Sequence, residues 1–142
     1  MVDSKFFKGE SKTVEFKAKL PDKSETYMKT IIAFANTSGG KLIIGIDDNK
    51  SIIGIDKDNI FEIMDKVTNA ISDACEPQIV PDISFKTVED KCILVIEIYP
   101  GANRPYYLKS KGKERGTYIR SAATSRLADS DKIRELEMEG KN

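Results

Sequence analysis

Residues 32–48, IAFANTSGGKLIIGIDD, contain the pattern that decides the fold. The stretch opens as the end of a helix that Ser24 can cap and whose apolar stripe continues to about Asn36. The glycines of the NTSGG sequence then stop the helix, because glycine tolerates the left-handed backbone needed just past a C-cap. Residues 41–46 are short and apolar on both faces, which is typical of a central strand. The pattern therefore predicts a helix that turns tightly into a buried strand.

The same kinds of pattern predict the elements on either side. Residues 13–19 alternate, with Val14 and Phe16 on the face opposite Glu15 and Lys17, and are predicted to form a half-buried strand. The mixture of elements predicts an α+β fold, a compact domain with a mixed or antiparallel sheet and about three helices. Further strands are expected at residues 51–55 (as a hairpin with 41–46), 83–88, 92–99, 106–109 and 117–120, and further helices at 58–74 and from 129 or 130 to about 139.

The composition excludes several classes of protein. The 142 residues are 39% hydrophobic, and 23 basic residues balance 23 acidic ones, which excludes a uniformly basic binder. No apolar run is long enough to span a membrane, and the N-terminal MVDSKFFKGESK has charges where a signal peptide needs an apolar run. Cys75 and Cys92 form no CxxC pair, which favours a reducing cytoplasm. The complete lack of histidine excludes Ser-His-Asp and Cys-His catalysis and His-ligated zinc.

The even charge balance hides a strong segregation. Between Arg104 and Arg126 there are seven basic residues and one acidic residue, Glu114, so this segment carries +6 and the rest of the chain −6. Cations neutralise phosphates and interleaved tyrosines can stack on bases, which favours a nucleic-acid surface around a flexible hairpin loop at 110–116. In the alternative interpretation, the tyrosines only pack the hairpin and the basic side chains are simply solvated. The predicted contacts are Arg104, Lys109, Lys111, Lys113, Arg115, Tyr118, Arg120 and Arg126.

Four carboxylates form a second candidate site. If Asp47 or Asp48 lies near the first strand, its oxygens together with Glu10 and Glu15 could hold Mg²⁺ or Mn²⁺ for phosphodiester cleavage. The metal ligands would be Glu10, Glu15 and Asp47, and a bend around residues 9–11 would be required, because positions five apart on a straight strand face opposite ways. In the alternative interpretation, Glu15 pairs with a lysine on the sheet and the aspartates are ordinary turn residues.

A fragment of a phosphate-binding loop occurs at residues 38–41, SGGK. It fails the Walker pattern, because Ala35 stands where the first glycine is required and Leu42 replaces the Ser or Thr. Its glycines precede a strand instead of a helix, so no helix N-terminus faces a phosphate. A helix-to-strand turn explains it better than nucleotide binding.

Several short motifs follow one another in a characteristic order and resemble the Schlafen-type, AlbA-like DNA-binding domain over residues 8–136. The motifs are Glu10-Ser11, VEFK at 14–17, IAFANTSGG at 32–40, LIIGIDD at 42–48, Ile53-Gly54, YIR at 118–120 and the segment 124–128.

The resemblance implies a nucleic-acid-binding domain that in bacteria is commonly the N-terminal part of a transcriptional regulator. In animal Schlafens a related domain cleaves RNA with two glutamates five residues apart and an aspartate. Glu10 and Glu15 match that spacing, and Asp47 or Asp48 would be the third member. Older naming ties some of these proteins to ATP binding. Tyr106 is a departure, because many members carry histidine there.

We therefore expect one domain over residues 1–142, the N-terminal part of a longer cytoplasmic protein without a membrane segment. Its expected function is DNA or RNA binding in a transcriptional regulator, with no certain cofactor. The second interpretation is a Mg²⁺- or Mn²⁺-dependent endoribonuclease. Two weaker alternatives are a protein-interaction module, such as a homodimerisation domain, and an ATP-binding domain. The interaction module is considered because the strands must leave a sheet edge exposed.

Overall fold

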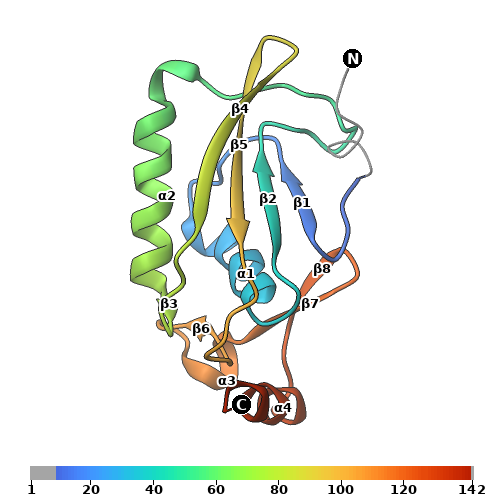
Figure 1. Ribbon diagram of the computed structural model, residues 1–142, viewed down its shortest axis with the longest axis vertical. Coiled ribbons are helices and arrows are strands. Elements are labelled where there is room, and N and C mark those ends of the chain that lie inside the picture. The colour runs from blue at the N-terminus through green and yellow to red at the C-terminus, as the bar shows by residue number, and fades with distance from the viewer. Residues whose placement is uncertain (1–8, 142) are drawn as a thin grey trace.

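The computed structural model describes residues 9–141 and is built around a four-stranded sheet (Figure 1). The strand order is β1-β2-β5-β4, in which β1 and β2 run parallel and the other neighbours run antiparallel. The predicted α+β fold with a mixed sheet is thus confirmed. The strands are β1 Val14–Lys17, β2 Gly40–Ile44, β4 Asp82–Val88 and β5 Lys91–Ile98.

Helix α1 (Ser24–Ala35) is buried on nearly all sides, as its apolar sequence requires. It lies between the sheet and a hairpin of two short strands, β7 (Tyr118–Ser121) and β8 (Thr124–Leu127). Helix α2 (Ile60–Ala74), preceded by the 3₁₀ helix η2 (Lys57–Asn59), packs beside α1 and β4 through its apolar stripe. Burial of α1 from both sides makes it the centre of the main core.

Both faces of β2 and β5 are buried, which explains their continuous apolar sequences. On one face, Leu42 and Leu94 join the core beneath the helices. On the other face, Ile43 and Ile93 form a smaller cluster, which Phe16 of β1 completes.

The C-terminal third supplies short elements at one end of the sheet (Figure 1). Strand β3 (Cys75–Glu76) pairs with β6 (Tyr107–Leu108), and β7 pairs with β8. Helix α3 (Gly112–Gly116) follows β6, and α4 (Ser130–Gly140) ends the described chain. The carboxylate of Asp129 caps α4 by accepting a hydrogen bond from the backbone N–H of Lys132 at 2.8 Å, as predicted.

Four local predictions are wrong. Ser24 does not cap α1, because it is the first residue of the helix, and Lys23 at the N-cap position makes no side-chain cap hydrogen bond. Residues 51–55 make only isolated bridges, because Gly45 and Gly54 have positive φ angles of 113° and 74° that take the backbone out of the extended conformation. Residues 110–116 are not a flexible hairpin loop, because they contain α3, so residues 9–141 hold four α-helices where about three were expected. The strands on either side do not pair with each other, since β6 pairs with β3 and β7 with β8.

No helix within residues 9–141 is long and apolar enough to cross a membrane.

Candidate nucleic-acid interface

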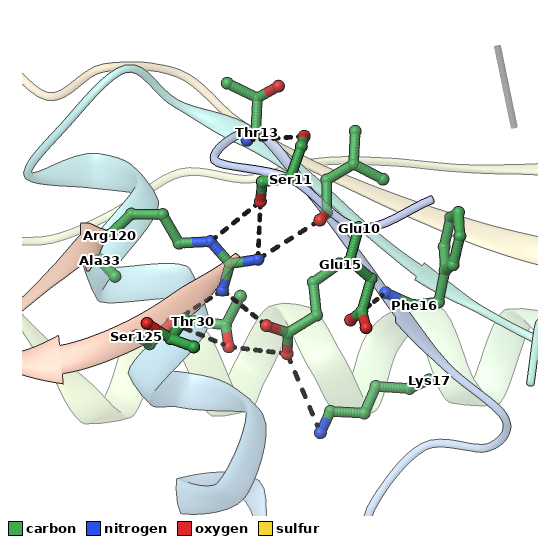
Figure 2. A network of polar contacts seen from close by, with 12 residues as sticks. Glu10, Ser11, Thr13, Glu15, Phe16, Lys17, Thr30, Ala33, Arg120 and Ser125 are labelled. Carbon is green, nitrogen blue, oxygen red and sulfur yellow. Dashed lines mark hydrogen bonds and ion pairs between the residues drawn. The ribbon is translucent and has the colours of Figure 1, made fainter. Parts of the chain in front are cut away.

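A buried ion pair joins the first strand to the C-terminal hairpin (Figure 2). Arg120 of β7 donates a hydrogen bond from Nη1 to Oε1 of Glu15 on β1 at 2.6 Å. The side chain of Arg120 is 0% exposed and that of Glu15 is 12% exposed, so the pair is shielded from water. Two charges 105 residues apart in the sequence therefore neutralise each other inside the fold.

The other polar groups of this pair are also satisfied. The Arg120 guanidinium donates from Nη2 to the backbone oxygens of Ser11 (2.9 Å) and Val14 (3.3 Å), and from Nη1 to Ser125 Oγ (3.0 Å). The Thr30 hydroxyl of α1 donates to Glu15 Oε2 at 2.9 Å. The bonds tie β1, α1 and the β7–β8 hairpin together (Figure 2).

Arg120 therefore belongs to the core and not to a surface that meets phosphate. The guanidinium also lies 5.1 Å from the ring centroid of Phe34, which covers it further. The alternation of β7 contained the signal for this: Arg120 is two residues from Tyr118, and the two side chains share the buried face. The net charge of the segment does not reveal the burial of Arg120.

Asn36 is a second buried polar group that the sequence analysis treated only as a helix stop. Its amide Nδ2 donates to the backbone oxygens of Tyr106 and Tyr118, both at 2.9 Å, and its Oδ1 accepts from the Tyr106 N–H at 2.8 Å. One side chain at the end of α1 thus holds the chain before β6 and the start of β7.

The remaining predicted contact residues are either partly buried by other contacts or exposed. Arg104 is partly buried, because it pairs with Glu139 at 3.1 Å and donates to the backbone oxygen of Thr37. Tyr118 is only 8% exposed and has the Lys29 ammonium 5.6 Å from its ring centroid, so little of the ring is free to stack on a base. The exposed members are Lys109, Lys111, Lys113, Arg115 and Arg126.

Four of these exposed cations, Lys109, Lys111, Lys113 and Arg115, lie on or beside α3, and we call them the α3 basic surface. Lys111 is 3.8 Å from Glu25 and Lys113 is 3.2 Å from Glu137. Such exposed pairs contribute little to stability and can exchange for other anions. Cations and their counter-charges thus occur together on this surface.

The elements beneath this surface are well packed. Leu108 and Thr117, on either side of α3, are buried, and a Cβ added at Gly116 would come within 2.9 Å of the Leu108 backbone. Burial raises the pKa of the neighbouring Cys75 thiol to about 12, while the charge of Lys109 lowers it in part. The basic side chains therefore extend from a well-packed backbone segment and not from a flexible loop.

The four candidate carboxylates do not form one ligand set. Glu10 Oε2 accepts from the Phe16 N–H at 3.2 Å, while Glu15 pairs with Arg120 and, at 3.8 Å, with Lys17 on the same strand, the lysine pairing that the alternative interpretation expected. Asp47 Oδ1 accepts from the N–H groups two and four residues later, both at 2.9 Å, as a turn residue does, and Asp48 is exposed. Within residues 9–141, no three Asp, Glu or Cys side chains are grouped to hold a metal ion. The residues therefore do not fit the metal centre that the resemblance implied.

The arrangement of this sheet, its two helices and the C-terminal hairpin defines a small α+β domain of a known class. A family model described as Schlafen, AlbA_2 matches residues 10–129, most of the chain. The protein belongs to this family, as its motifs predicted.

Two solved structures share the fold. One is the DIP2311 protein from Corynebacterium diphtheriae, with a TM-score of 0.64 and 23% sequence identity over 87% of this chain. The second is the N-terminal domain of a protein from Nitrosomonas europaea described as related to the ATP-dependent DNA helicase RecG, with a TM-score of 0.57 and 24% identity. The match covers 81% of this chain and 82% of that domain. This chain spans only 26% of the length of the Corynebacterium protein.

Proposed function

We propose that this chain is a nucleic-acid-binding domain and that the α3 basic surface contacts the phosphate backbone. The observation that carries the proposal is the concentration of four exposed cations within seven residues, on the packed helix α3 and just before it. Cations held in this way can neutralise successive phosphates and release the counterions condensed on them. Arg126, exposed on β8, is a further candidate contact.

The charges around these cations agree with the proposal. Lys109 and Arg115 have no ion pair with another described residue, while Lys111 and Lys113 face single, exposed glutamates. A phosphate can replace an exposed carboxylate at little cost, because both interactions are screened by solvent. The surface is therefore able to accept an anionic polymer without rearrangement of the core.

The family supports a role connected with nucleic acids, and one relative of the same fold is described as helicase-related. We further propose that the chain is the N-terminal module of a longer DNA-binding transcriptional regulator. The match to only 26% of the Corynebacterium protein supports membership of a longer protein, and the matched Nitrosomonas structure is itself an N-terminal domain. The α3 basic surface would then supply affinity, and another module would supply sequence preference.

The test is a salt titration of binding to labelled duplex DNA, single-stranded DNA and tRNA. For duplex DNA, four engaged cations predict a slope of about −4 in the plot of log affinity against log salt. Lys111→Glu/Lys113→Glu/Arg115→Glu should reduce the size of that slope by about 3 and weaken binding at least 100-fold at low salt, on the order expected for three lost phosphate contacts.

The matched control is Lys50→Glu/Lys57→Glu/Lys66→Glu, which changes net charge equally at exposed positions outside the α3 basic surface. Equal losses in both variants, or binding that does not depend on salt, would contradict the proposal. Denaturing gels, run after incubation with EDTA or Mn²⁺, show whether the nucleic acid has been cut. Metal-dependent cutting would favour the endoribonuclease instead.

A further inference from the structure

Strand β4 forms an open edge of the sheet. The strand order ends at β4, and among residues 9–141 no strand pairs with its outer side. In Figure 1 it lies at the side of the sheet nearest α2, away from β1. The strand is seven residues long and most of its side chains are exposed. Long, open edge strands are sites where a further strand can add.

An apolar surface adjoins this edge. Phe85 of β4 is 41% exposed and Phe61, in the first turn of α2, is 68% exposed. Their rings contact each other edge to face, with centroids 6.0 Å apart. Two large aromatic side chains left in water beside an open edge indicate a surface that another protein covers.

We propose that a second copy of this chain covers the edge, with β4 paired antiparallel to its counterpart about a two-fold axis at Ser84. In that register each Asp82 lies opposite Lys86 of the other copy, and each Ile83 opposite Phe85. The pairing places two oppositely charged pairs on one face of the sheet and two apolar pairs on the other. It joins two four-stranded sheets into one continuous sheet.

The charges select this register over its neighbours. A two-fold axis perpendicular to the sheet must pass through a residue, since it keeps each side chain on its own face. An axis at Asp82 or at Lys86 would oppose like charges. An axis at Ile83 or at Phe85 would form no pair between Asp82 and Lys86. Only the axis at Ser84 matches both charges at once.

The apolar side gains from the same arrangement. Phe85 of each copy would lie between Ile83 of the other copy and its own Phe61, so both aromatic rings would lose contact with water. A lysine in an edge strand normally discourages strand addition. Among axes at residues 82–86, only the axis at Ser84 sets an acidic residue of the other copy opposite this lysine, which would restrict pairing to a defined dimer. The inference does not depend on nucleic-acid binding.

The register can be tested by cross-linking. Ser84→Cys places two thiols directly opposite each other, at a Cβ separation of about 4.5–5.5 Å, close enough for a disulfide after a small adjustment. We expect rapid formation of a covalent dimer on mild oxidation. Ser51→Cys, an exposed position in the turn after β2, is the control and should form no covalent dimer. Equal cross-linking of the two variants would overturn the proposal.

Sedimentation velocity from ~1 µM to ~1 mM, the range of weak associations, tests the charge pairs without a cross-link. Asp82→Lys should raise the dimer dissociation constant by about tenfold or more, because it opposes lysines at two symmetric positions. The swap Asp82→Lys/Lys86→Asp should restore it to within about threefold. Asp22→Lys, an equal charge change in the loop before α1, should have no effect.

Circular dichroism of each variant would show that it is folded. A wild-type chain that remains monomeric at ~1 mM would overturn the proposal, as would a dimer that Asp82→Lys leaves intact or the swap fails to restore.

Discussion

Arg115 and Arg120 are five residues apart in the same basic segment, yet they occupy opposite environments. Arg115 is exposed on α3, while the side chain of Arg120 is fully buried and bonded to Glu15, to Ser125 and to the backbone in and just before the first strand. The comparison shows that a cluster of charges in a sequence is not one surface. Strand alternation and a distant partner decide which cation is available to a ligand.

The two arginines should also differ in what their loss costs. An exposed cation is hydrated in the folded and unfolded states, so its removal changes little. Removal of a buried partner leaves an uncompensated charge in a poorly solvated site. Variants of the buried and exposed positions therefore test the comparison directly.

The largest difference is expected between Arg120→Met and Arg115→Met. The first removes the closer cation from Glu15, leaves Lys17 at 3.8 Å, and should lower the free energy of unfolding by about 3–5 kcal/mol. The second should change it by less than about 0.5 kcal/mol. Urea denaturation followed by circular dichroism measures both. Similar losses in the two variants would show that Arg120 is not a core residue.

The second test extends the comparison to buried and exposed asparagines. Asn36→Ala removes three hydrogen bonds and leaves buried backbone groups of Tyr106 and Tyr118 unsatisfied. We expect a loss of about 2–4 kcal/mol in the free energy of unfolding. Asn69→Ala on the exposed side of α2 should stay within about 0.5 kcal/mol of the wild type. A small effect at Asn36 would argue against its role in holding the hairpin.

Alkaline pH should weaken the packing beneath the α3 basic surface. Burial raises the pKa of Cys75 from 9.0 to about 12, so between these values the folded chain retains a proton that the unfolded chain loses. Stability conferred by the neutral thiol is fully present below pH 9 and falls as the pH rises. The loss approaches ~1.4 kcal/mol per pH unit, or about 2 kcal/mol by pH 10.5.

Urea curves at pH 8 and pH 10.5, in the presence of reductant, measure this dependence. Cys75→Ala should reduce the difference between the two pH values, although Tyr27, whose pKa burial also raises, contributes with the same sign at higher pH. An unchanged difference in Cys75→Ala would indicate that the thiol is not the responsible group.

The smallest effect is expected from the hydroxyl that supports Glu15. Thr30→Val keeps the shape of the side chain but removes the hydrogen bond of 2.9 Å to Glu15 Oε2. We expect a loss of about 1 kcal/mol. Thr26→Val on the exposed side of α1 is the matched control. Equal values for the two threonines would show that the hydroxyl does not support the ion pair.

Much of the architecture could be predicted from local patterns. The apolar runs of β2 and β5, the amphipathic spacing of α2 and the NTSGG turn each depend on neighbouring residues, so they are readable along the chain. Gly39, with a φ of 78°, shows why that turn needs glycine: a Cβ there would come within 2.7 Å of the Ile98 backbone oxygen. The order of these motifs also sufficed to indicate the family.

The candidate site was less predictable, because its residues are brought together over long separations. The sequence by itself determined the α+β class, the family and the existence of a basic segment, since these depend on composition, periodicity and motif order. Only the tertiary structure decided that Arg120 pairs with Glu15 and that Asn36 bonds to the backbone of Tyr106 and Tyr118. It also decided that the cations of the α3 basic surface remain exposed to solvent. The physical reason is that burial and charge compensation depend on partners from other elements, and no local pattern specifies a partner 105 residues away.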